Sequence, residues 1–348
     1  MDITQLLKFG VDRGASDILI TANSAPVVRL NGELSITKAA PLTPTDTRTL
    51  VYSVLTDSQK AKFEAEKELD FSLSFRDKYR FRGNAYIQRG HVAANFRLIP
   101  SEIPSLEELK LPPVVEELSL KHQGLVIVSG PTGHGKTTTQ AAMINIVNNK
   151  RRCHIVTVED PIEFVHVNNR SVVDQREVGD DTLSFANALK HVLRQDPDVI
   201  LVGEMRDLET VATALTAAET GHLVIATLHT NDAVQSIDRM IDVFPPHQQH
   251  QVRAQLALCL LAVISQRLLP KADKTGRIVA VEIMRNIAAV ANLIREGKAH
   301  NVYTVMETQS KEGMQTMDSS IKSLYLKGLV TYEEAKQRMR DPKMLDLA

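Results

Sequence analysis

Hydrophobic residues recur with a period of two between residues 68 and 98. The residues that carry this period are Phe71, Leu73, Phe75, Tyr79 and Phe81. Serines separate the first three, and Arg80 and Arg82 flank Phe81. Because successive side chains of a strand point to opposite faces, the pattern predicts antiparallel strands with one aromatic core face and one face that bears arginines.

Turn and helix signals complete the pattern of the first hundred residues. A helix is expected to begin near Pro44, because proline favours the first turn of a helix. Further strands are expected at Asp17–Ile20 and Val92–Leu98. Turns are expected at Asn31-Gly32, as a hairpin turn within 26–34, and at Arg76-Asp77-Lys78. We predict that residues 1–100 form a small α/β domain around an antiparallel sheet.

Continuous apolar segments replace the alternating pattern later in the chain. They are Leu125–Val128, His154–Val158, Val199–Val202 and Leu223–Ala226. Amphipathic stretches lie between them, and such strands separated by helices predict a parallel sheet covered on both faces. Prolines, including Pro100, mark residues 101–118 as a linker. We expect an α/β core in 119–270 and a mostly helical region in 271–348, with one strand near Ile278–Ile283.

The segment Gly130–Thr137 matches the phosphate-binding pattern GxxxxGK(S/T) between a predicted strand and a predicted helix. Its backbone N–H groups and the helix N-terminus favour bound phosphate, Lys136 can reach the β- and γ-phosphates, and Thr137 can bind Mg²⁺. The predicted nucleotide-binding residues here are Gly130, Thr132, Gly133, His134, Gly135, Lys136, Thr137 and Thr138. ATP and Mg²⁺ are the expected cofactors.

A carboxylate follows the apolar strand Val199–Val202. Glu204 lies at the carboxyl end of this strand, where ligands bind in such folds, and is the candidate for orienting the attacking water. Gly203 occupies the place where many P-loop proteins carry a metal-binding aspartate, so we expect Mg²⁺ to be held partly through water. A surface carboxylate without a catalytic role is the alternative.

Two further carboxylates and two histidines follow or flank neighbouring strands. Glu159 and Glu163 are expected at the same edge as Glu204, where they can hold metal-bound water, although a turn cluster around Pro161 is an alternative. His229 is expected beside the γ-phosphate. His222 lies at the opposite end of its strand, where a structural or subunit contact is the simpler interpretation.

Composition excludes several classes of protein. The chain has 42 acidic and 41 basic residues and a formal net charge of -1, which disfavours a protein that coats nucleic acid. Its two cysteines, Cys153 and Cys259, form neither a zinc motif nor a disulfide framework. The apolar runs are too short to span a bilayer and the N-terminus lacks the apolar core of a signal peptide. We expect a cytoplasmic protein that is not inserted into a membrane.

Several motifs together resemble those of the type IV pilus retraction ATPases, the PilT family of the secretion ATPase superfamily. They are ASDILIT, GPTGHGKTTT, VEDPIEFVH, QREVGDDTLSFANAL, DPDVILVGEMRDLET, AAETGHLVIATLHT and GMQTMD. The resemblance covers nearly the whole chain. It implies an N-terminal PAS-like domain, a RecA-like ATPase domain with a helical C-terminal region, and a homo-hexameric ring that retracts type IV pili in twitching motility.

The resemblance also assigns roles to individual residues. Glu204 corresponds to the catalytic Walker B glutamate, VEDPIE to the acidic box, and His222 with His229 to the histidine box. Arg80, Arg82 and Arg97 correspond to arginines that approach the phosphates, whereas a solvated basic face or a nucleic-acid surface are the alternatives from composition. The implied partners are an inner-membrane platform protein at its cytoplasmic face and a paralogous retraction ATPase.

One departure from the family concerns the motif AIRNLIRE, which is present here as 289–296 with Ala291 in place of arginine. That motif is associated with retraction rather than with hydrolysis, so the expectation of ATPase activity is unaffected. The alternative functions are a pilus-assembly or type II secretion ATPase of the same superfamily and, further away, a nucleic-acid translocase.

Overall fold

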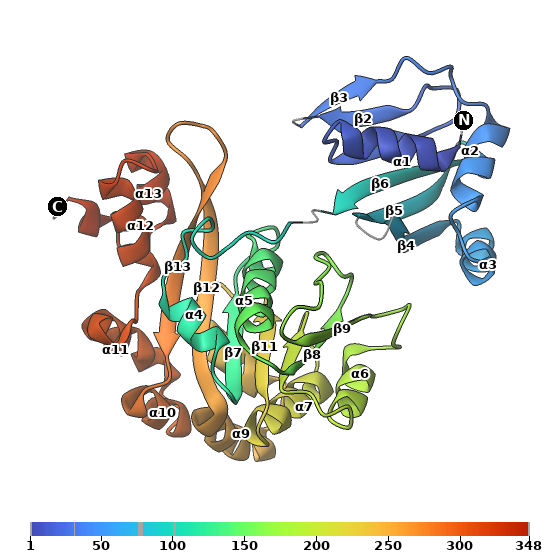
Figure 1. Cartoon of the computed structure of the whole chain (residues 1–348). Coiled ribbons are helices and arrows are strands. Elements are labelled where there is room, and N and C mark those ends of the chain that lie inside the picture. Colours follow the sequence, from blue (N-terminus) through green and yellow to red (C-terminus); the bar gives the residue numbers. More distant parts are fainter. Residues whose placement is uncertain (1, 31, 76–78, 100–101, 347–348) are drawn as a thin grey trace. The chain divides into compact units, whose positions relative to one another are not determined.

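The computed structural model describes residues 2–30, 32–75, 79–99 and 102–346. The predicted turns at Asn31 and at Arg76-Asp77-Lys78, together with Pro100, include residues outside the described ones. The chain forms two compact units, one of Met1–Glu102 with Glu163–Val165 and one of Ile103–Ile162 with His166–Ala348. Figure 1 labels the helices and strands of the two units.

The first unit is built on an antiparallel six-stranded sheet with the strand order β3-β2-β1-β6-β5-β4. Its strands are β1 (Asp17–Ile20), β2 (Val27–Leu30), β3 (Glu33–Ile36), β4 (Glu68–Phe75), β5 (Tyr79–Gln88) and β6 (His91–Ile99). Its helices are α1 (Ile3–Asp12), α2 (Pro44–Tyr52) and α3 (Asp57–Glu66). Thr43 and Thr56 cap the last two helices in reciprocal hydrogen bonds with Asp46 and Gln59, which explains where these helices begin.

The alternation of aromatic and arginine residues predicted for β5 is confirmed. Phe81 is buried with Phe71 and Phe96, while Arg82 and Arg97 lie opposite each other on neighbouring strands with exposed side chains. Arg97 donates through Nε to Asp17 Oδ1 at 3.0 Å. The basic face of this sheet is thus partly neutralised by one buried carboxylate.

The second unit contains a seven-stranded sheet with the order β13-β12-β7-β11-β10-β8-β9, in which all neighbours are parallel except β12 and β13. Its strands are β7 (Gly124–Ser129), β8 (His154–Glu159), β9 (Val172–Glu177), β10 (Val199–Val202), β11 (Leu223–Leu228), β12 (Leu260–Pro270) and β13 (Arg277–Arg285). The predicted α/β class and parallel sheet are therefore confirmed.

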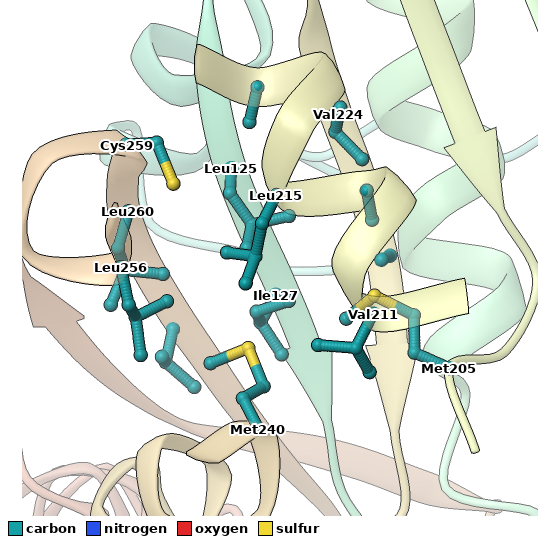
Figure 2. Packing of buried hydrophobic residues seen from close by; sticks show 14 of the residues in the cluster. Leu125, Ile127, Met205, Val211, Leu215, Val224, Met240, Leu256, Cys259 and Leu260 are labelled. Carbon is teal, nitrogen blue, oxygen red and sulfur yellow. The ribbon is translucent and has the colours of Figure 1, made fainter. Parts of the chain in front are cut away.

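Helices cover both faces of this sheet. The helices are α4 (Val114–Ser119), α5 (Lys136–Lys150), α6 (Phe185–Val192), α7 (Leu208–Glu219), α8 (Ala233–Asp242), α9 (Pro246–Cys259), α10 (Ala288–Arg295), α11 (Val302–Thr308), α12 (Met317–Leu326) and α13 (Tyr332–Arg338). Short 3-10 turns are at Ala299–Asn301, Ser310–Glu312 and Pro342–Leu345. Figure 2 shows one core layer, in which Leu125 and Ile127 of β7 lie near Leu215 of α7 and Met240 of α8.

The structure corrects the expectations for two strands and for the linker of this unit. Strands β9 and β12 were not predicted: β9 has a polar second half, and the apolar run at the start of β12 directly continues helix α9, so the pattern there does not distinguish strand from helix. The proposed linker 101–118 is mostly part of the second unit, because Leu106, Leu111 and Val115 are buried in its core.

No helix within the described residues is long and apolar enough to cross a membrane.

Candidate functional site

The phosphate-binding loop connects β7 to α5 in the way that the sequence predicts. Ser129 is the last residue of β7 and Lys136 the first of α5, and Gly135 precedes the helix with φ 82°. Gly130 has φ 142°, and a Cβ atom built on it would lie 2.4 Å from the carbonyl oxygen of Gln266 in β12. A glycine is therefore required at Gly130 both by its backbone conformation and by the close approach of a neighbouring strand.

Lys136 is buried, with 8% of its surface exposed. Its Nζ donates to the carbonyl oxygens of Gly130 at 2.8 Å and of Pro131 at 3.0 Å. The ammonium group is thus held on the inner side of the loop, where it faces any anion bound by the loop amides. A buried cation at this place favours a negatively charged ligand.

Lys136 of α5, His229 of the loop after β11 and Glu204 of the loop after β10 form a chain of polar contacts. Nζ of Lys136 lies 3.3 Å from Nδ1 of His229, and Nε2 of His229 lies 3.0 Å from Oε1 of Glu204. Since the ammonium can only donate, His229 accepts at Nδ1 and donates from Nε2 to the carboxylate, which assigns the neutral tautomer. Burial, and then the charge of Lys136, lower the pKa of His229 and favour this neutral form.

Glu204 has a second partner. The Nε of Arg206 donates to the same oxygen, Oε1, while the arginine side chain is 75% exposed and that of Glu204 17%. The interaction with Glu204 raises the pKa of Arg206. An exposed guanidinium and a half-buried imidazole therefore orient one carboxylate beside the loop, as a residue that positions water requires.

Gly203 is closely packed at the position before Glu204. A Cβ atom there would lie 3.1 Å from the carbonyl oxygen of Val158 and 3.2 Å from Cα of Glu159. The hydroxyl of Thr227 donates to the carbonyl oxygen of Gly203. A side chain at this position would therefore be in tight contact with the backbone of β8.

The two carboxylates after β8 differ in environment. Glu159 is buried and accepts hydrogen bonds from Thr157 Oγ1 at 2.7 Å and Gln175 Nε2 at 3.1 Å. Glu163 is exposed and follows Ile162, whose N–H donates to Glu177 Oε2 at 3.1 Å. Glu159 thus lies at the edge expected from the sequence, held by its neighbours in the sheet, whereas the role of Glu163 stays a prediction.

The loop is also fastened from the side of β12 and β13. The main-chain N–H of Leu268 donates to Nδ1 of His134 at 3.1 Å, and Nε2 of Gln266 donates to the carbonyl oxygen of His134 at 2.6 Å. Arg277 donates from a terminal nitrogen to the carbonyl oxygen of Gly133 at 3.2 Å. Burial lowers the pKa of His134, so its ring remains an acceptor near neutral pH. The sequence suggests only that a histidine is tolerated at this position. In the structure, the side chain of His134 also helps to hold the loop against β12.

One predicted residue of the second unit, His222, lies away from this cluster. His222 is at the opposite end of β11 from His229, with Nδ1 3.0 Å from the carbonyl oxygen of Ala217. The structure therefore does not bring His222 to the loop of its own chain, as its position in the sequence already indicated. Arg80, Arg82 and Arg97 belong to β5 and β6 of the first unit, and their predicted role at phosphates is untested.

Three residues of the site were missed by sequence reasoning. Arg206 follows Glu204 by two positions, and this spacing was an available signal because both lie in the loop after β10. Gln266 and Arg277 had no local signal, because Gln266 reaches the loop through the parallel pairing of β12 with β7, and Arg277 through the antiparallel pairing of β13 with β12. The fold alone brings these two residues to the loop.

The sequence and the fold of this chain are similar to those of known proteins. The family model described as Type II/IV secretion system protein matches residues 101–337. The type IV pilus retraction ATPase PilT of Pseudomonas aeruginosa is 47% identical over 99% of both chains. The type IV pilus ATPase PilU of the same organism is 43% identical over 96% of this chain and 88% of its own. A crystal structure of the pilus retraction motor PilT with bound ADP superposes with a TM-score of 0.93, at 49% identity and 100% coverage of both chains.

Proposed function

This chain belongs to the type II/IV secretion system protein family, and we propose that it is an ATP-hydrolysing motor that retracts type IV pili. The family membership confirms the resemblance inferred from the motifs. The function follows that of the relatives, which include a retraction ATPase that matches this chain over 99% of its length.

The observation that carries the proposal is the chain of contacts from Lys136 through His229 to Glu204. It joins the cation at the phosphate-binding loop to a carboxylate that follows β10, and β11 separates β10 from β7 in the sheet. A phosphate-binding loop alone indicates binding of a nucleotide, whereas the oriented carboxylate supplies the group that hydrolysis needs. Glu204 is proposed to orient water toward the γ-phosphate, and Lys136 to stabilise the charge that develops on it.

The donor set at the loop fits a nucleotide with Mg²⁺. The hydroxyl of Thr137 is at the start of α5, and the carboxylates of Glu204 and Glu159 are at the ends of β10 and β8. We propose that Thr137 contacts Mg²⁺ directly and that the carboxylates contact it through water. A bound Mg²⁺ would draw charge from the phosphoryl oxygens. His229 is proposed to report the state of the γ-phosphate to Glu204.

Further parts of the proposal concern the assembly. We propose a homo-hexamer at the cytoplasmic face of the inner membrane, acting on a platform protein and sharing its work with a paralogous ATPase. An N-terminal PAS-like domain and a RecA-like ATPase domain are the proposed building blocks. Arg80, Arg82, Arg97 and His222 are proposed to contact phosphate charge or a neighbouring subunit, and Glu163 to act at the metal-bound water.

The deciding experiment is live imaging of labelled pili in the native host, with Glu204→Gln introduced at the chromosomal locus. Pili that extend, never shorten and accumulate would support the retraction motor. Cells without pili would show that the chain drives assembly instead. A Lys190→Gln strain is a matched control, because Lys190 pairs with Glu209 at an exposed site away from the loop and its loss removes one charge in the same unit.

A further inference from the structure

One buried carboxylate in the second unit has no role in the site described above. Glu282 of β13 is 2% exposed. Its Oε1 accepts the N–H of Ala233 at 2.8 Å, and its Oε2 accepts the N–H of Met317 at 3.4 Å. Ala233 and Met317 are the first residues of α8 and α12. A single side chain thus holds the starts of two helices that are 84 positions apart in the sequence.

The first of these contacts lies close to His229. Ala233 follows His229 by four residues, and the segment between them connects β11 to α8. Within it, the hydroxyl of Thr230 lies 2.7 Å from that of Ser236, and Asp232 caps the helix by accepting from Gln235 N. The segment that carries His229 is therefore fastened at its helical end, and Glu282 supplies the anchor that comes from the sheet.

Glu282 also lies in register with the strand that leads into the phosphate-binding loop. Glu282 pairs with Ser265 of β12, and Ser265 pairs with Ser129 of β7. The hydroxyls of Ser265 and Ser129 are 2.7 Å apart and fully buried. Because directly paired residues point to the same face of a sheet, a buried polar row runs from Glu282 to the residue before Gly130.

A carboxyl group in this position is costly. Burial raises the pKa of Glu282 to about 7, against the lowering effect of the N–H of Ala233. An apolar residue of similar size would avoid the desolvation of a carboxyl group. What an apolar residue cannot do is accept hydrogen bonds from two helix starts at the same time.

We propose that Glu282 is a positioning residue of the ATPase site, which links the segment of His229 and the start of α12 to the strand beneath the phosphate-binding loop. It acts through His229, whose ring contacts both Lys136 and Glu204. The inference rests on the proposed ATPase function and adds the element that connects this site to the C-terminal helices.

The test is the steady-state ATPase activity of the full chain with Glu282→Gln. Glutamine has nearly the same size but can accept with only one oxygen, so one of the two helix starts loses its anchor. Misplacing a catalytic group by small distances costs up to about a hundredfold in rate. We expect kcat to fall by roughly ten- to a hundredfold while KM for ATP changes less than about threefold, because Lys136 and the loop remain in place.

A double-mutant cycle with His229→Ala separates positioning from general damage. If Glu282 acts through His229, adding Glu282→Gln to His229→Ala lowers kcat by less than about twofold more. Amide exchange at Ala233 gives a readout independent of turnover, and it should become faster in Glu282→Gln. If that variant fails to fold, Glu282→Asp keeps the charge but shortens the reach, and the same comparisons apply.

Asp318→Asn is the matched control. Asp318 is also 2% exposed and also accepts two backbone hydrogen bonds, from Arg340 and Asp341 at 2.8 Å each, but these lie within the C-terminal region. Its kcat should stay within about threefold of the wild type.

Several outcomes would overturn the proposal: an unchanged kcat in Glu282→Gln, an equal loss in Asp318→Asn, or full additivity with His229→Ala. An inactive wild type would instead contradict the proposed function, and faster exchange at Ala233 in Glu282→Gln would still support the anchor itself.

Discussion

At the scale of single residues, the site depends on a few charged groups whose partners define their protonation. His229 accepts from a cation on one side and donates to a carboxylate on the other, so it has to be neutral. Glu204 is oriented from two sides, by His229 and Arg206. These arrangements make the contributions of Lys136 and Glu204 separable by experiment.

Lys136→Ala and Glu204→Gln are expected to fail at different steps. Without the ammonium, the loop loses the buried cation that contacts the carbonyl oxygens of Gly130 and Pro131, so ATP binding should be lost in Lys136→Ala. Glu204→Gln should bind ATP but turn it over about 10²–10³-fold more slowly, because one oriented electrostatic group is removed. Nucleotide titration by fluorescence and a phosphate-release assay measure the two steps. Turnover near the wild-type rate in Glu204→Gln would contradict its assignment.

His229 predicts a loss of activity at acid pH. Burial and Lys136 lower its pKa below the usual value of 6.5, so the ring stays neutral at neutral pH and becomes charged only at a lower pH. A protonated ring cannot accept from Lys136, and kcat should therefore fall as pH decreases through this lowered pKa. The pH profile of kcat measures this, with His229→Gln as control. A profile of the same shape in the control would assign the acid limb to another group.

Glu282 predicts a pH-dependent stability. Its pKa is about 7 in the folded chain and near 4.5 when unfolded, so the folded state binds more protons between these values. The stability contributed by this carboxyl is complete below pH 4.5 and decreases as pH rises to about 7. The loss amounts to on the order of 3 kcal/mol. Melting temperatures of the wild type and of Glu282→Gln at pH 5 and pH 8 test this. The melting temperature of the variant relative to that of the wild type should be higher at pH 8 than at pH 5. If the difference in melting temperature is the same at both pH values, the pKa of Glu282 is not raised in the folded chain.

At the scale of elements, the phosphate-binding loop is held by a strand that is remote in sequence. β12 lies beside β7, and its Gln266 approaches Gly130 and His134. β13 adds Arg277 at Gly133. The phosphate-binding loop is thus packed against the antiparallel pair of β12 and β13. Its conformation depends on these two strands as well as on its own glycines.

This packing distinguishes two glycines of the loop. In Gly130→Ala the added Cβ would lie 2.4 Å from the carbonyl oxygen of Gln266, whereas in Gly133→Ala no atom lies within 4 Å of it. Both positions have positive φ, so both variants carry backbone strain of about 1 kcal/mol or more. We expect the melting temperature without nucleotide to fall clearly further in Gly130→Ala. Equal decreases would mean that β12 moves away from the added Cβ atom without a loss of stability.

At the scale of the whole molecule, the proposed ring makes activity depend on assembly. If Arg82 or Arg97 acts on a neighbouring subunit, isolated chains lack these groups at their sites. ATPase activity per chain should then rise cooperatively with protein concentration. Arg82→Gln should lower the ATPase activity without changing the melting temperature, because the side chain of Arg82 is exposed. Phosphate release across a dilution series, with sedimentation at the same concentrations, measures both. Activity that stays constant through the monomer range would remove the requirement for a ring.

The sequence by itself determined the local features of this protein. The loop Gly130–Thr137, the strand before Glu204 and the arginine face of β5 were all predictable, because each depends on neighbours within a few residues and on the periods of strand and helix. The resemblance to the family was likewise carried by short motifs. These features account for the α/β class and for the nucleotide-binding core of the site.

Only the tertiary structure decided which distant residues complete the site. β12 and β9 are strands because they pair with β7 and β8, although their own patterns are ambiguous. Gln266, Arg277 and Glu282 reach the loop or its supports through strand pairing, and such pairing depends on register between segments far apart in the chain. Local patterns record which face of an element is buried, whereas the partner across that face is set by packing of the whole unit.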